Sequence, residues 1–99
     1  MDVKLVDRGA TGELILSGDL DTKTARDADE LFSKMADRFQ NLIMNMQGLD
    51  YISSAGIRSI RNLYVKLLRN GGKLEVINVN ENVMEVFEMT GLAGLLNIR

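Results

Sequence analysis

The chain has 99 residues, of which 45% are hydrophobic and 26% are charged, and its formal net charge is −2. These values are typical of one globular domain that buries a core of its own. Cysteine and histidine are both absent, which excludes disulfides, histidine-activated nucleophiles and histidine phosphorelay, and nearly all zinc sites. We therefore expect no enzyme activity, no cofactor, no metal site and, since no basic footprint exists, no direct binding of nucleic acid.

The sequence also indicates where in the cell the protein is found. Residues 1–4 lack the basic and apolar regions of a signal peptide. No apolar run reaches the roughly 18 residues that a membrane span needs. The expectation is a cytoplasmic protein without a membrane span.

The first part of the chain predicts a β-hairpin and then an amphipathic helix. Residues 3–7 and 14–16 are the two strands, and a turn with two glycines at 9–12 joins them. Residues 18–22 close the second strand, and Asp21 or Thr22 can cap the helix that follows. The apolar residues of this helix share one face: Ala25, Ala28, Phe32, Met35 and Phe39.

A third strand and a second helix come next. Residues 41–46 form the mostly apolar strand, and Asn45 and Gln47 mark its exit. Apolar residues then recur at helical spacing from Ser54 to about Asn70, where two glycines stop the helix. Ser53 and Ser54 therefore fall at a helix start. There a hydroxyl caps free backbone N–H groups, or the positive end of the helix dipole favours a phosphate.

The rest of the chain predicts a fourth strand at 73–79, a third helix capped by Asn80 and ended by Gly91, and a last strand at 95–98. The order is ββαβαβαβ in one domain, residues 1–99. Alternating strands and helices after the hairpin predict parallel pairing with right-handed crossovers, as in α/β folds. Core filling is expected of four methionines: Met44, Met46, Met84 and Met89. For Met89, next to the Thr90-Gly91 turn, a position facing a partner is the alternative.

Four short segments carry a family resemblance. They are Gly18-Asp19-Leu20-Asp21 with Thr24-Ala25, then residues 49–57 (Leu-Asp-Tyr-Ile-Ser-Ser-Ala-Gly-Ile), then Gly71-Gly72-Lys73-Leu74, then residues 86–92 (Val-Phe-Glu-Met-Thr-Gly-Leu). With these four segments in this order, the chain resembles the bacterial anti-sigma factor antagonists, which are single STAS domains. The resemblance implies a STAS-like α/β domain with a mixed, mostly parallel sheet, an N-terminal β-hairpin and helices packed mainly on one face. Many members add a C-terminal helix, which we expect residues 1–99 to lack.

The function that the resemblance implies is partner switching. An unphosphorylated antagonist binds an anti-sigma factor, which is also a serine kinase using ATP, and so releases a sigma factor. Phosphorylation of one antagonist serine separates the two proteins, and a serine phosphatase resets the switch. Counting back from Gly56, this serine is Ser54, with Ser53 as the alternative. Ser53 stands where the family often has Asp, and Ala55 where it often has Ser or Thr.

The candidate partner-binding residues surround this serine: Asp19, Asp21, Thr22, Ser53, Ala55, Gly56, Arg58 and Arg61. Arg58 and Arg61 lie one turn apart, where two roles are open to them: pairing with acidic partner residues or neutralising the phosphate. Simpler interpretations stay open, with the serines and Asp21 as helix caps, Asp19 solvated, and the two arginines on a solvated face. A second function also stays open: a phosphorylation-independent STAS adaptor, such as a transporter-associated subunit or a scaffold of a signalling complex. Phosphate turnover at Ser54 discriminates between the two functions.

Overall fold

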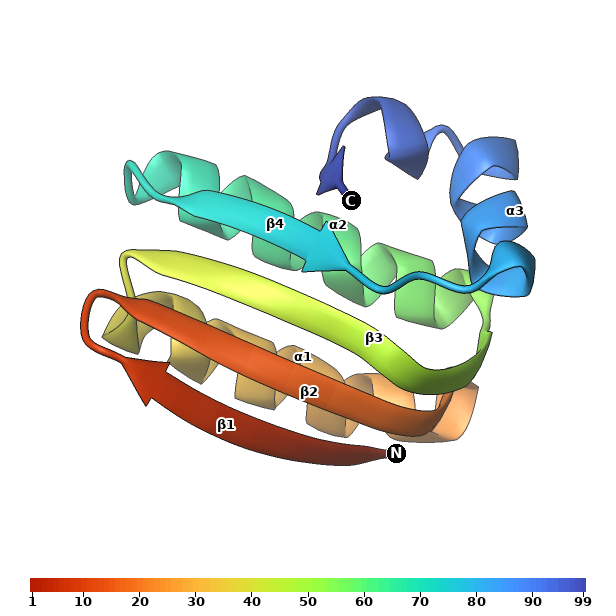
Figure 1. Ribbon diagram of the computed structural model, residues 1–99, viewed down its shortest axis with the longest axis horizontal. Coiled ribbons are helices and arrows are strands. Elements are labelled where there is room, and N and C mark those ends of the chain that lie inside the picture. Colours follow the sequence, from red (N-terminus) through yellow and green to blue (C-terminus); the bar gives the residue numbers. More distant parts are fainter.

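Five strands and three α-helices make up the computed structural model, which describes residues 1–99 (Figure 1). Their order is β1 (Asp2–Arg8), β2 (Thr11–Leu20), α1 (Thr22–Arg38), β3 (Asn41–Ile52), α2 (Ser54–Arg69), β4 (Lys73–Ile77), α3 (Glu81–Met89), a 3₁₀ turn (Leu92–Gly94) and β5 (Asn97–Ile98). The strands lie side by side in the order β1-β2-β3-β4-β5, with β1 antiparallel to β2 and the other pairs parallel. The predicted hairpin, element order and mixed sheet are confirmed.

Helices α1 and α2 cover one face of the sheet, which confirms the predicted layering. In Figure 1 both lie behind the sheet and run along its strands, while α3 packs against the end of β3. Leu14 of β2 lies opposite Met44 of β3, which lies opposite Val76 of β4, and all three are fully buried. Phe32 of α1 and Ile60 of α2 complete this part of the core. None of the helices is long and apolar enough to span a bilayer.

A chain of polar hydrogen bonds crosses the opposite face of the sheet. Glu13 is 8% exposed, and its carboxylate accepts from the Arg8 guanidinium at 2.7 Å and from the Asn45 amide at 3.1 Å. Asn45 in turn accepts from the Asn78 amide at 3.1 Å. The bonds from Arg8 and Asn45 hold the pKa of Glu13 below its ordinary value, against the opposing effect of burial. These bonds satisfy the polar groups that sit among the strands on the face without helices.

The strands β2 and β3 are both longer than predicted. β2 spans Thr11–Leu20 and β3 continues to Ile52, whereas the predicted strands are residues 14–16, closed by residues 18–22, and residues 41–46. The two strands stay paired through register shifts between Ile15 and Ser17 and between Gly18 and Asp19. Such shifts break the regular alternation of buried and exposed residues without ending a strand, so the prediction that Asn45 and Gln47 mark the exit is wrong.

The two C-terminal strands are shorter than predicted. β4 ends at Ile77 because Asn78 adopts a left-handed backbone with φ of 59°, which an extended strand cannot continue. The last strand is only Asn97–Ile98, because the N–H groups of Leu95 and Leu96 both donate to the Leu92 carbonyl at the end of the 3₁₀ turn. The third helix is capped by Asn80, whose side chain accepts from the Val83 N–H at 2.9 Å, as predicted.

The methionines divide between the core and the surface. Met44 and Met46 are fully buried and Met84 is partly buried, but Met89 is 80% exposed. The prediction that Met89 fills the core is therefore wrong. α3 packs through Val83 and Phe87, one turn apart, and helical periodicity turns Met89 to the opposite side.

Replacing Glu13 tests the polar chain. We expect Glu13→Gln to lower the free energy of unfolding by about 1 kcal/mol at pH 7, since hydrogen bonds to a charged acceptor are lost. A carboxylate with a lowered folded-state pKa stabilises above its unfolded pKa, about 4.3, and this stabilisation disappears as the pH falls through the folded-state pKa. Urea unfolding from pH 7 to pH 3 should therefore show the two proteins converging at acid pH. Glu30→Gln, at an exposed position outside the ion pairs, is the control, and a pH-independent difference would contradict this account.

Candidate functional site

Figure 1 shows the connections from β2 to α1 and from β3 to α2 at the carboxyl edge of the sheet. Most of the predicted site residues fall on these connections and the first helical turns after them, and Arg58 and Arg61 follow within α2. Because β2 and β3 are parallel neighbours, both connections emerge at this edge, where α/β proteins commonly bind ligands. The Ser53 N–H donates to the Leu20 carbonyl at 2.9 Å, and Asp19 is paired in register with Tyr51. The structure thus brings the segment 19–22 against the segment 53–56.

The two serines of this edge differ in their contacts. Ser53 is the N-cap of α2, with an extended backbone and an Oγ that accepts from the Gly56 N–H at 3.2 Å. Ser54 is the first residue of the helix; it is exposed, and its hydroxyl takes no part in the cap. The two interpretations of the sequence therefore separate, because the cap is Ser53 and the exposed hydroxyl is Ser54.

A reciprocal cap holds the start of α1. The Asp21 carboxylate accepts from the N–H groups of Lys23 and Thr24, each at 3.0 Å, and the Thr24 hydroxyl accepts from the Asp21 N–H at 3.0 Å. The bond from the Thr24 N–H is the main cause that holds the pKa of Asp21 below its ordinary value. Of the two predicted caps the structure has Asp21, and Thr22 is an exposed residue of the first turn.

Gly56 lets α2 approach the end of β2. It is buried, and a Cβ at this position would lie 2.7 Å from the Leu20 carbonyl oxygen and 2.9 Å from Cγ1 of Ile52. The carbonyl belongs to the backbone, so the clash cannot be relieved by rotating a side chain. Gly56 therefore positions the two serines from the interior of the domain.

The charges of α2 are all of one sign. The helix contains four cationic residues and no acidic residue. Arg58 and Arg61 are exposed and lie outside the four ion pairs of the structure. With Ser54 they occupy positions i, i+4 and i+7, which share one side of a helix. The predicted arginines thus form an exposed cationic side that begins at the predicted phosphorylation site.

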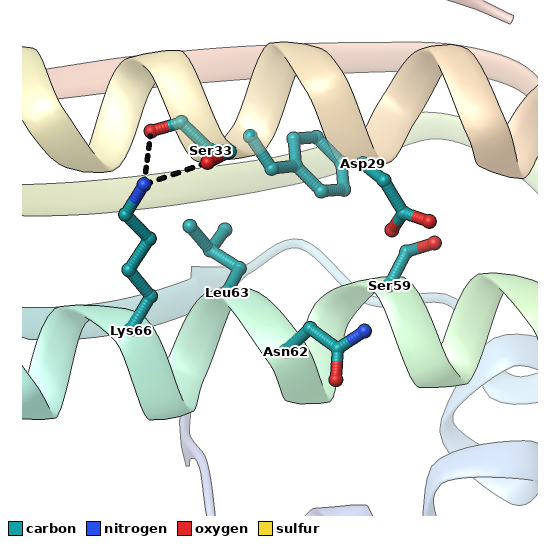
Figure 2. A pocket seen from close by; sticks show the side chains of 7 residues that line it. Asp29, Ser33, Ser59, Asn62, Leu63 and Lys66 are labelled. Atoms are coloured by element: carbon teal, nitrogen blue, oxygen red, sulfur yellow. Dashed lines mark hydrogen bonds between the residues drawn. The ribbon is translucent and has the colours of Figure 1, made fainter.

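A groove between α1 and α2 contains none of the predicted site residues. Figure 2 shows its lining, with Lys66 of α2 donating to the Ser33 hydroxyl at 2.6 Å. Lys66 also pairs with Asp37 at 3.1 Å. At the other end of the groove the buried Ser59 donates to backbone carbonyls of both helices. These bonds join α1 to α2, so the groove is best explained as part of the helix packing.

Tyr51 is an exposed residue of this edge that sequence analysis missed. The residue is 53% exposed at the end of β3, next to Asp50, and it lines a small pocket against α3. Since β3 was predicted to end at Met46, Tyr51 was not placed in the sheet. Tyr51 and Asp50 are both exposed, so this end of β3 presents an aromatic ring and a carboxylate to solvent.

A Gly56→Ala variant tests the close approach of α2 to β2. Alanine is favoured over glycine in helices by about 1 kcal/mol. We nevertheless expect the variant to lower the free energy of unfolding by about 1–3 kcal/mol in urea, because overpacking displaces the backbone. Gly94→Ala is the control, since a Cβ there meets nothing within 4 Å. A Gly56→Ala protein as stable as the parent would contradict the packing role.

The different contacts of the two serines predict different effects on stability. Ser53→Ala should lower the free energy of unfolding by about 1 kcal/mol, the usual cost of losing a helix cap. Ser54→Ala should change it by less than about 0.5 kcal/mol, as is usual for exposed positions. Thermal unfolding of both variants under one buffer condition checks this pair. Equal destabilisation by the two substitutions would mean that both hydroxyls support the helix.

Comparison with known proteins identifies the family. The anti-sigma-B factor antagonist of Staphylococcus aureus is 25% identical over 87 residues, which are 87% of this chain and 81% of the relative. The solved structure of the anti-sigma factor antagonist SpoIIAA in its unphosphorylated form matches with a TM-score of 0.85 at 20% identity, over 99% of this chain and 88% of that protein. The phosphorylated form of SpoIIAA, from Bacillus, matches with a TM-score of 0.77 at 19% identity, over 99% and 91%. A family model described as the STAS domain matches residues 3–99, and the chain therefore belongs to the STAS domain family.

Proposed function

We propose that this STAS domain is an anti-sigma factor antagonist that binds an anti-sigma factor kinase and is switched off by phosphorylation of Ser54. The names of its relatives support the class of partner, and one relative is known in a phosphorylated form. The observation that carries the proposal is the exposed Ser54 hydroxyl, which is free of the cap that Ser53 supplies. A kinase can modify such a hydroxyl without removing a bond that the fold uses.

The domain itself should tolerate a phosphate at this position. Phosphorylation adds a charge of about −1.5 to −2 at neutral pH. The first turn of α2 has backbone N–H groups without a partner in the helix, and the helix dipole favours a negative charge there. Ser53 keeps its bond to Gly56, so the cap persists beside the modified residue. Phosphorylation therefore acts on the surface rather than on the fold.

A partner that packs against the neutral hydroxyl should not tolerate the phosphate. An unpaired charge that is buried in an interface, or that faces a like charge there, weakens binding by several kcal/mol. About 4 kcal/mol corresponds to roughly a thousandfold in affinity, because each 1.4 kcal/mol is a factor of ten. This change separates a tight complex without a large rearrangement of either protein.

The proposed partner surface surrounds Ser54 on the carboxyl edge. Asp19 and Thr22 are exposed on one connection, Arg58 and Arg61 are exposed on α2, and three half-exposed residues lie between them: Asp21, Ser53 and Ala55. The surface carries both signs of charge, which suits recognition by charge complementarity. Gly56 contributes by holding the two connections together.

The proposal extends to the setting of the switch. Residues 1–99 act as one STAS domain in the cytoplasm, a serine phosphatase removes the phosphate, and the domain does no catalysis of its own. The anti-sigma factor supplies the kinase and its ATP.

Two substitutions at Ser54 test the proposed switch by affinity. Ser54→Ala should bind the candidate anti-sigma kinase as tightly as the parent, and addition of ATP should no longer release it. Ser54→Asp should bind at least tenfold more weakly, with an unchanged melting temperature. Isothermal titration calorimetry with and without ATP measures both effects.

Ser53→Ala is the matched control for the release by ATP. It removes a neighbouring hydroxyl, and we expect it to lower stability while the release by ATP persists. Release of Ser54→Ala by ATP would contradict the proposed site. The parent protein could instead bind equally tightly with and without ATP, while the same kinase is shown to be active on another substrate. That result would support the phosphorylation-independent adaptor.

A further inference from the structure

Arg58 is an unpaired cation one helical turn after Ser54. Its side chain is exposed, and it takes part in none of the four ion pairs. Its own helix offers it no carboxylate, because α2 contains no acidic residue. Lys66 of the same helix, by contrast, already pairs with Asp37 of α1. The Arg58 guanidinium is therefore available for an anion on the surface of α2.

The geometry of a helix directs this guanidinium toward Ser54. Four residues span about 6 Å along the axis and bring positions i and i+4 onto the same side. Side chains in a helix lean toward its N-terminus, so a side chain as long as that of arginine at position 58 can reach the turn that starts at Ser54. The helix dipole also favours this order of charges, with the anion on the N-terminal residue of the pair and the cation on the C-terminal residue.

We propose that Arg58 is the internal counter-ion of phosphorylated Ser54, with guanidinium N–H groups donating to phosphate oxygens. The inference rests on the proposed phosphorylation of Ser54. The planar guanidinium presents paired donors that match phosphate oxygens, which makes arginine better suited than lysine to this contact. Three carboxylates lie on the same edge of the domain: Asp19, Asp21 and Asp50. Their negative potential opposes a dianion there, and Arg58 offsets it.

The contact gives phosphorylation a second effect on a partner. The phosphate adds negative charge, and it also withdraws the Arg58 guanidinium from the surface that an acidic partner group could use. Arg61 lies about 10 Å along the axis from Ser54 and keeps its charge exposed. An aspartate at position 54 has a shorter side chain and one negative charge, so it imitates only part of this change.

Phosphoserine installed at position 54 during translation tests the contact without any kinase. A ³¹P NMR titration of the full chain gives the second pKa of the phosphate. We expect this pKa to be lower in the parent than in Arg58→Gln, with Arg58→Lys between them, since a paired cation favours the dianion. Arg69→Gln is the matched control: it removes the same charge from the same helix, about 22 Å from Ser54 along the axis, and should leave the pKa at the parent value.

Ionic strength provides a second measure of the same contact. At about 1 M salt the screening length falls to about 3 Å, so the difference between the parent and Arg58→Gln should shrink. An equal phosphate pKa in the parent and Arg58→Gln at low salt would overturn the inference. An equal shift from Arg69→Gln would overturn it as well, since it would reveal only the overall charge of the helix.

The titration separates this inference from the proposed function. If the phosphate pKa is the same with and without Arg58, the counter-ion role is wrong, and the proposed phosphorylation of Ser54 is unaffected. A kinase that never modifies Ser54 contradicts the switch, although the titration of the installed phosphate is unchanged. Arg58 is exposed, so its variants should fold, and the melting temperature of each unphosphorylated variant checks that they do.

Discussion

The contact between the end of β2 and the start of α2 is the constraint on which the rest of the site depends. The Ser53 N–H donates to the Leu20 carbonyl, and the same carbonyl oxygen leaves no room for a Cβ at Gly56. This approach fixes where α2 begins, and it places the capped start of α1 beside the capped start of α2. Two connections that are distant in sequence thereby become one surface with Ser54 exposed on it.

The separation of the cap from the exposed hydroxyl shows how one short segment would serve both stability and the proposed regulation. Ser53 uses its oxygen to satisfy a backbone donor, so a modification there would remove support from the helix. The Ser54 hydroxyl makes no such bond, so the proposed phosphate would be added and removed there without loss of a bond that the fold uses. Arg58 lies one turn later and is unpaired, so its guanidinium would pair with the proposed phosphate on Ser54 within the domain.

Much of this arrangement follows from local sequence, and its exceptions have physical causes. Hydrophobic periodicity and cap residues were sufficient to predict the element order, and the family resemblance pointed to the segment around Ser54. The register shifts that lengthen β3 and the left-handed backbone of Asn78 depend on neighbouring strands and turns, which a sequence pattern does not reveal. Either serine could have been the cap, and only the position at which α2 meets Leu20 decides between them.

The central claim is that Ser54, and not Ser53, receives the phosphate. Mass spectrometry of the parent protein after incubation with its candidate anti-sigma kinase and ATP tests it most directly, with fragmentation to separate the two adjacent serines. The account predicts one added phosphate, located on Ser54. A phosphate located on Ser53, or none at all from a kinase shown to be active on another substrate, would contradict it.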